Sequence, residues 1–344
     1  MPPNKWHSKK ETMEMYFNTK IIDIKQDTYD NRIIQLILEK EPLSNHINWN
    51  DRYMDEAQNK LSIGVGYFGI VSMDLEKHPH SFVAGETGSG KSNILKCMIY
   101  QSLIKNYDVI LIDFKRGVSF SNFEGAITVY YEYDTAMKIL KEMVEETKRR
   151  LDLFRENKVD NINAYNKVTI DYLHRKIIFI DELAELLKIR DKEISRILYD
   201  CIETLARLSR AVGIHLIMGI QRPDSTIING QIKNNVSFRI CGRFVDKEPS
   251  RIVLGNDMAS NLTNIKGRFI VKDDNLQEIQ SFYYSDSSPY RANKATRNVL
   301  EDKNNKESEM APTSQNEPLE EPETEEDTNV SKKLDFDFSD IKKV

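Results

Sequence analysis

The sequence contains few of the features that mark membrane, secreted or metal-stabilised proteins. It has only 3 cysteines among 344 residues, and Cys97, Cys201 and Cys241 lie far apart. This spacing predicts neither a disulfide framework nor a cysteine-ligated metal. No apolar run reaches the roughly 18 residues of a membrane helix, and no apolar stretch follows the first residues, so we expect neither a membrane segment nor a signal peptide. These absences favour a cytoplasmic protein, which a partner could still recruit to a membrane.

Charge is distributed unevenly along the chain. The formal net charge of −5 conceals an acidic segment, residues 301–344, with 14 acidic and 6 basic residues. The remaining chain is therefore mildly basic. That balance is compatible with a polyanionic partner but does not by itself indicate one.

Composition divides the chain into three zones. Residues 1–60 mix short β-like runs with polar stretches and predict a small N-terminal β-containing module. In residues 61–290, apolar strands alternate with helical patterns, which predicts an α/β domain with a mostly parallel central sheet. Residues 291–344 have too few large apolar side chains to form a core and predict a disordered acidic tail. Within it, residues 334–341 (LDFDFSDI) are either plain tail or a short peptide that docks on a protein partner.

The middle zone predicts specific elements. The strands are expected at 81–84, 109–113, 177–181, 215–220 and 238–242, and the helices at 91–105, 134–156, 194–211 and near 246–254. The helix over 134–156 has an apolar stripe of Met137, Leu140, Val144 and Leu151.

The clearest chemical motif joins the first of these strands to its helix. It reads Gly85-Glu86-Thr87-Gly88-Ser89-Gly90-Lys91-Ser92 and fits G-x-x-x-x-G-K-[ST]. The glycines allow a tight turn whose N–H groups point at phosphate oxygens, and the helix adds its positive N-terminal end. Lys91 is then expected to reach the β- and γ-phosphates of ATP, and the Ser92 hydroxyl to bind Mg²⁺.

Two carboxylates end the apolar strand at 177–181. We predict that Asp181 holds the Mg²⁺ shell and that Glu182 polarises the attacking water. Such a pair is often only a strand entering a helix, but the phosphate loop upstream favours the catalytic interpretation, because an ATPase needs both groups.

Two further features stay open on the residues alone. Gln221 ends an apolar strand before Pro223, and its amide is either a phosphate sensor or an ordinary turn residue. The basic cluster Lys148, Arg149 and Arg150 is either a solvated helix face or a source of an arginine that acts on a neighbouring subunit.

Taken together, these segments resemble the motor domain of the FtsK/SpoIIIE DNA translocases, within the FtsK–HerA group of P-loop ATPases. The resemblance covers residues 61–274. It includes the run from Asp74 to His80 before the phosphate loop and Asp113-Phe114-Lys115 after the next strand. It also includes Asp181-Glu182 and the run from Leu205 to His215, which is followed by Gln221-Arg222-Pro223.

The resemblance implies a RecA-like core, a homo-hexameric ring around double-stranded DNA, and ATP bound between subunits. It implies that Gln221 is the sensor and that Arg150, or else Arg149, is offered to the neighbouring site.

The long chromosomal members also carry membrane helices and a winged-helix domain, which this sequence does not show. We therefore expect a role in plasmid or mobile-element DNA transfer, mobilisation or segregation. Two alternatives remain. Type VII secretion ATPases share the motor and would imply a protein cargo, although they usually carry several motor domains. A nucleotide-dependent scaffold without catalysis is disfavoured by the intact Lys91, Ser92, Asp181 and Glu182.

Overall fold

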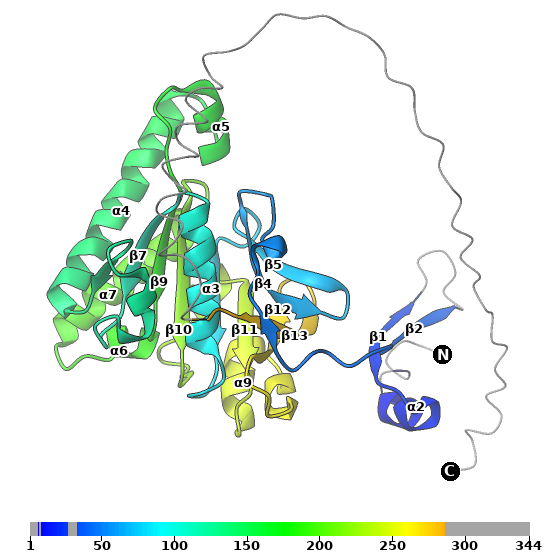
Figure 1. The fold of residues 1–344 in the computed structure, drawn as a ribbon. Helices are drawn as coiled ribbons and strands as arrows, with labels where there is room; N and C mark the ends of the chain where they lie inside the picture. Colours follow the sequence, from blue (N-terminus) through cyan, green and yellow to red (C-terminus); the bar gives the residue numbers. More distant parts are fainter. Residues whose placement is uncertain (1–5, 7, 27–32, 286–344) are drawn as a thin grey trace, which may run out of the picture. The chain divides into compact units, whose positions relative to one another are not determined.

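The central feature of the fold is an eleven-stranded mixed sheet. The structure is a computed structural model that describes residues 6, 8–26 and 33–285. Along the sheet the strands follow the order β5-β4-β13-β12-β11-β6-β10-β9-β7-β8, and β3 pairs with β13 (Figure 1). The predicted acidic tail, with its 334–341 peptide, lies outside the described residues. Among the helices of the described part, none is both long and apolar enough to cross a bilayer.

The parallel half of the sheet contains all five strands that the sequence predicts. These are β6 (His80–Ala84), β7 (Asp108–Ile112), β9 (Lys176–Ile180), β10 (Ile214–Ile220) and β11 (Phe238–Gly242). The strand β8 (Thr128–Tyr130) extends this half by pairing parallel to β7. The predicted α/β fold with a mostly parallel central sheet is confirmed.

An antiparallel extension continues the sheet beyond β11, and the sequence did not predict it. It consists of β12 (Arg268–Lys272), β13 (Leu276–Tyr283), β4 (Lys60–Gly66) and β5 (Gly69–Asp74), each antiparallel to its neighbour. The short β3 (Ile47–Asn48) runs parallel to β13. Residues before 60 thus contribute to this sheet.

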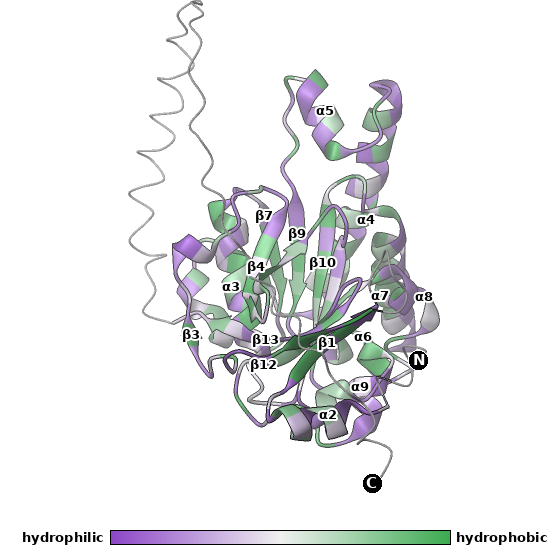
Figure 2. Cartoon of the chain, turned by 90° about the vertical axis from the view of Figure 1, so that its right-hand side faces the viewer, coloured by the Kyte–Doolittle hydropathy of each residue, from purple (hydrophilic) through white to green (hydrophobic). Residues whose placement is uncertain are grey.

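Helices cover both faces of the sheet and bury a separate core on each. One core lies under α3 (Lys91–Ile104) and includes Val83, while the other includes Phe82 and lies under α4 (Tyr133–Glu156) and α7 (Lys192–Leu208). Neighbouring residues of one strand therefore face opposite cores, as expected when a sheet is buried on both faces. In Figure 2 green stretches mark the central strands and purple covers much of α4.

The remaining helical elements are short. They are α5 (Ile162–Val168), α6 (Leu183–Leu187), α8 (Gly230–Asn235), α9 (Lys247–Leu254) and the 3₁₀ turns η1 (Asp51–Tyr53), η2 (Val118–Phe123) and η3 (Met258–Asn261). Of these, the sequence predicted only α9.

The N-terminal segment forms a small α/β unit with its own apolar cluster. The helix α2 (Lys10–Phe17) precedes the antiparallel pair β1 (Ile21–Gln26) and β2 (Ile34–Leu38). Met13, Ile21 and Ile24 form its buried centre. The predicted small β-containing module is therefore present, and the domain boundaries at 60 and 290 stay predictions.

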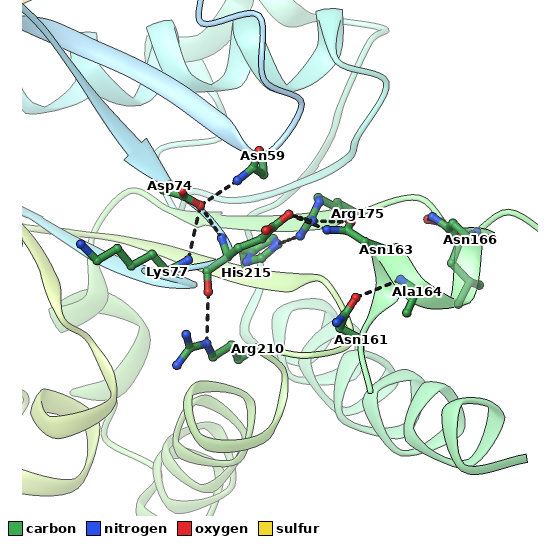
Figure 3. A network of polar contacts seen from close by, with 12 residues as sticks. Asn59, Asp74, Lys77, Asn161, Asn163, Ala164, Asn166, Arg175, Arg210 and His215 are labelled. Atoms are coloured by element: carbon green, nitrogen blue, oxygen red, sulfur yellow. Dashed lines mark hydrogen bonds and ion pairs between the residues drawn. The ribbon is translucent and has the colours of Figure 1, made fainter. Parts of the chain in front are cut away.

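A polar network joins the amino ends of β9 and β10 to the segment before β6. Figure 3 shows His215 beside Arg175, whose Nη1 lies 3.3 Å from His215 Nε2. Arg175 also pairs with Glu76 at 3.1 Å, and Asn163 of α5 donates to the same carboxylate. The Asp74–His80 segment, one of the segments behind the family resemblance, thus fixes α5 to the end of the sheet away from the phosphate loop.

Two histidines of this region are completely buried and neutral. His80 Nδ1 accepts a hydrogen bond from the Leu216 N–H at 3.0 Å, and His215 Nδ1 lies 3.1 Å from the Pro79 carbonyl. Burial lowers the pKa of His80 from 6.5 to about 3 and holds the pKa of His215 well below 6.5, with Arg175 adding to the latter effect.

These histidines predict acid sensitivity of the fold. Because their pKa is depressed in the folded state, their stabilising contribution is present above pH 6.5 and is lost as pH falls toward 3. Lowering the pH from about 7.5 to about 5.5 should reduce the free energy of unfolding by about 3 kcal/mol, measured by urea denaturation. The His215→Asn variant should show about half of this loss. A free energy of unfolding that does not change over this pH range would contradict the assignment of His80 and His215 as neutral in the folded state.

Candidate functional site

The phosphate loop occupies the turn between β6 and α3. β6 ends at Ala84 and α3 begins at Lys91, as the sequence predicted. Gly88 and Gly90 have φ values of 88° and 108°, a left-handed conformation that side chains rarely adopt. A Cβ at Gly90 would also lie 3.2 Å from the Gly267 nitrogen, so this glycine allows both the turn and the close approach of β12.

The structure brings Lys91, Ser92 and Asp181 together at the carboxyl ends of β6 and β9. Lys91 Nζ lies 3.0 Å from Asp181 Oδ1 and also contacts the Asp181 carbonyl oxygen. The Ser92 hydroxyl lies 3.4 Å from the same Oδ1. Lys91 and Asp181 are 4% and 2% exposed, so a buried ammonium and a buried carboxylate lie beside the half-buried Ser92 hydroxyl.

A glycine on the neighbouring strand makes room for this contact. A Cβ at Gly219 of β10 would lie 2.1 Å from the Asp181 carbonyl oxygen and 2.8 Å from Lys91 Nζ. Any larger residue would therefore collide with the Asp181 backbone as well as with the ammonium group. The sequence placed Gly219 in a strand but gave no sign of this role.

Glu182 and Gln221 are joined across the ends of β9 and β10. Glu182 Oε2 accepts a hydrogen bond from the Gln221 N–H at 3.0 Å, and Oε1 accepts one from the Ala184 N–H at 3.4 Å. Thr87 of the phosphate loop donates to Gln221 Oε1 at 3.2 Å. Burial raises the pKa of Glu182, while the Lys91 charge and the two N–H donors oppose that shift. A buried carboxylate held in this way is equipped to accept a proton from water.

A strand that ends in a phosphate loop, with a buried carboxylate pair on a nearby strand, is the site of a P-loop nucleoside triphosphatase (NTPase). A family model described as FtsK/SpoIIIE family matches residues 47–225, more than half of the chain. The chain belongs to the FtsK/SpoIIIE family. The family's match begins at the first residue of β3, which pairs with β13 of the main sheet.

Curated relatives in the FtsK/SpoIIIE family are longer than this chain. This chain is 32% identical over 257 residues to DNA translocase FtsK of Staphylococcus aureus strain Mu50. The aligned region covers 67% of this chain and 32% of that protein. A DNA translocase FtsK of Leptospira interrogans is 34% identical over 63% of this chain and 24% of its own length. The chain thus spans about a third of the length of the curated relatives it matches.

Among solved structures, one similar protein is the pCW3 conjugation coupling protein TcpA, determined as a monomer with ATPγS. It is 41% identical, with a TM-score of 0.70, and the match covers 83% of each chain. The cytoplasmic domain of the Thermomonospora curvata type VII secretion ATPase EccC is 22% identical, with a TM-score of 0.57 over 69% of this chain and 30% of that one. That second similarity concerns the fold alone.

Arg150 lies apart from the phosphate loop, on the core side of α4. Its side chain is 2% exposed, and it donates to Glu146 Oε1 at 2.7 Å and to the Val212 carbonyl at 2.9 Å. Arg149, which also pairs with Glu146, is 54% exposed. In this conformation Arg150 is engaged within its own chain, and its role at a neighbouring site stays a prediction.

Lys115 is a site residue to which the sequence gave no role. Its Nζ lies 3.3 Å from Asp181 Oδ2, so the second carboxylate oxygen faces a second ammonium group. Asp113 orders the turn that carries Lys115 by accepting hydrogen bonds from the Lys115 and Gly117 N–H groups at 3.0 and 2.9 Å. The Asp-x-Lys spacing was visible in the sequence, but only the parallel pairing of β7 with β9 places Lys115 next to Asp181.

Proposed function

We propose that this chain is an ATP-hydrolysing motor that moves double-stranded DNA and serves DNA transfer. The observation that carries the proposal is the convergence of Lys91, Ser92, Asp181 and Glu182 at one edge of the sheet. The relatives support DNA as the cargo, because they are named DNA translocase and conjugation coupling protein. The similarity to the secretion ATPase concerns the fold only and adds no support for a protein cargo.

ATP would bind with its phosphates in the loop of residues 85–92. Lys91 already neutralises the buried Asp181 carboxylate, and phosphate oxygens would offer its ammonium another anionic partner. Glu182 would accept a proton from the attacking water, with its carboxylate oriented by the Gln221 N–H. Since Gln221 also contacts Thr87, its position would respond to the occupancy of the loop.

The donor set beside the loop fits Mg²⁺. The Ser92 hydroxyl and the Asp181 carboxylate are oxygen donors 3.4 Å apart, and Mg²⁺ prefers one or two carboxylates together with phosphate oxygens. When bound, Mg²⁺ supplies positive charge to those phosphate oxygens. Ser92 and Asp181 are therefore the residues that would hold it.

The family resemblance also leads us to propose a cytoplasmic homo-hexameric ring that encloses the duplex. Such a ring would grip the phosphate backbone without reading base sequence, because a translocating motor must pass over every sequence. An arginine from the adjacent subunit would complete each ATP site, and Arg149 is the exposed member of the predicted pair.

The proposal predicts that linear double-stranded DNA stimulates ATP hydrolysis several-fold. Steady-state phosphate release should be measured with duplex, with single strands of the same length and without DNA. The stimulation should weaken as salt is raised, since binding to phosphates releases counterions. The Lys91→Ala variant controls for contaminating ATPases. A turnover rate indifferent to duplex would argue against DNA as the cargo.

A further inference from the structure

The second oxygen of the Asp181 carboxylate contacts a lysine to which the proposed mechanism gives no role. Lys115 Nζ lies 3.3 Å from Asp181 Oδ2, and Lys91 Nζ lies 3.0 Å from Oδ1. One buried carboxylate therefore faces two ammonium groups of its own chain. We propose that Lys115 excludes divalent cations from Asp181 unless nucleotide phosphates bind with them, an inference that rests on the proposed ATPase function.

The backbone that carries Lys115 is fixed by the turn after β7. The buried Asp113 carboxylate accepts hydrogen bonds from the Lys115 and Gly117 N–H groups. Gly117 has a φ of 72°, and a Cβ there would lie 3.2 Å from a methyl carbon of Val129. The turn therefore requires glycine at this position, and it places Lys115 beside Asp181 at the end of β9.

The carboxylates on either side of this contact are engaged by backbone N–H groups. Asp113 uses one oxygen for the Lys115 N–H and the other for the Gly117 N–H. Glu182 likewise accepts from two backbone N–H groups, one on each oxygen. Asp181 differs from both, because its carboxylate oxygens contact the two ammonium groups and the Ser92 hydroxyl. Its negative charge is therefore the one that the two lysines neutralise.

A divalent cation at Asp181 would meet two positive charges at close range. Lys91 and Asp181 are buried, so solvent and salt screen their interactions only weakly. With Lys115 in contact, the ammonium groups outnumber the Asp181 carboxylate, and like charges at such distances repel. The phosphates of ATP bring several negative charges, which reverse this balance and give both ammonium groups further anionic partners. Metal binding is therefore unfavourable without phosphates and favourable with them.

The Lys115 side chain can leave Asp181 without disturbing the core. It is 48% exposed, whereas the Lys91 side chain is 4% exposed. The exposed Glu185, in the first turn of α6, is close enough for its charge to act on Lys115. A lysine carries its charge on a flexible four-carbon stem, so the ammonium group has a second carboxylate to pair with when a metal ion takes its place.

The test measures metal binding to the full chain without nucleotide. Mn²⁺ is the probe, because it shares the preference of Mg²⁺ for oxygen ligands and its free concentration can be read by electron paramagnetic resonance. We expect Lys115→Met to bind Mn²⁺ at least about tenfold more tightly than wild type, since changes beside metal ligands alter metal affinity by about 10–100-fold. Lys115→Arg, which keeps the positive charge, should bind Mn²⁺ like wild type.

Two controls locate the effect. Lys176 Nζ pairs with Asp108 Oδ2 at 2.6 Å and joins β9 to β7 at the opposite ends of the same two strands. Lys176→Met should therefore leave the Mn²⁺ affinity at the wild-type value. In the Lys115→Met chain, adding Asp181→Asn should remove the gained affinity, because Asp181 is the carboxylate that the lysine releases.

Binding of ATPγS in the presence of Mg²⁺ tests the proposed ATPase function separately. A wild-type chain that does not bind ATPγS would overturn that function and the role of Lys115 with it. If wild type binds ATPγS, equal Mn²⁺ affinities of wild type and Lys115→Met would overturn the role of Lys115 alone. The same holds if Lys115→Arg gains as much Mn²⁺ affinity as Lys115→Met, or if the gain persists after Asp181→Asn.

Discussion

Glu182→Gln is expected to leave ATP binding intact while slowing hydrolysis at least about 100-fold. Glu182 is 7% exposed and lies at the carboxyl end of β9 next to Asp181, within the site that contains Lys91. Its proposed role in hydrolysis is to take a proton from water, and an amide cannot do this. The amide oxygen can still accept the hydrogen bond from the Gln221 N–H, so the local structure should persist.

The experiment separates binding from chemistry. Binding of ATPγS and single-turnover hydrolysis of ATP should be measured for wild type and for the variant. Lys91→Ala is the contrasting variant, because loss of the ammonium should abolish binding as well as turnover. Ordinary turnover by Glu182→Gln would refute the role given to this carboxylate.

Arg150→Ala is expected to destabilise the fold by roughly 2–4 kcal/mol. The guanidinium is buried, donates to the Val212 carbonyl at 2.9 Å and pairs with Glu146 at 2.7 Å. Burial alone would raise the pKa of Glu146, but the hydrogen bonds from Arg149 and Arg150 outweigh it and lower that pKa to about 2. Removal of Arg150 leaves a buried carbonyl without its donor and opens space under α4. Chemical denaturation measures the loss.

The adjacent Arg149→Ala provides the matched control. Arg149 is 54% exposed, so its pair with Glu146 should contribute less than about 1 kcal/mol. If Arg149 acts on a neighbouring site, Arg149→Ala should lose ATPase activity without losing stability. Mixing it with Lys91→Ala subunits should restore turnover. Equal stability of the two alanine variants would contradict the structural role of Arg150.

The sequence alone determined five strands of the parallel half of the fold and the core of the site. The pattern G-x-x-x-x-G-K-[ST] between an apolar strand and a helix specifies its own structure, because loop and helix are contiguous in the chain. The predicted β11 (Phe238–Gly242) matches the structure at both ends, and the other strands match within one residue at each end. Continuous apolar runs between polar segments give a strong local signal.

The position of Arg150 was also present in the sequence, but the charge pattern concealed it. Met143, Thr147, Arg150 and Phe154 follow helical spacing and lie on the buried face of α4. Continuing the apolar stripe through positions 147 and 150 would have placed this arginine inside. A charged side chain is expected at the surface unless polar partners are available inside. The main partner of Arg150, the Val212 carbonyl, is distant in the sequence and could not be foreseen.

The antiparallel half of the sheet and the second half of the site depended on tertiary structure. β4 and β5 form one local hairpin, and β12 and β13 form another. The pairing of β13 with β4 joins these hairpins from distant parts of the chain, and no local pattern specifies it. The pairing of β3 with β13 brings a segment from before residue 60 to the end of β13, and Lys115 reaches Asp181 only through the pairing of β7 with β9. The sequence thus located the predicted phosphate loop, since that motif is local. Only the tertiary structure decided what surrounds it, because those contacts join residues far apart in the chain.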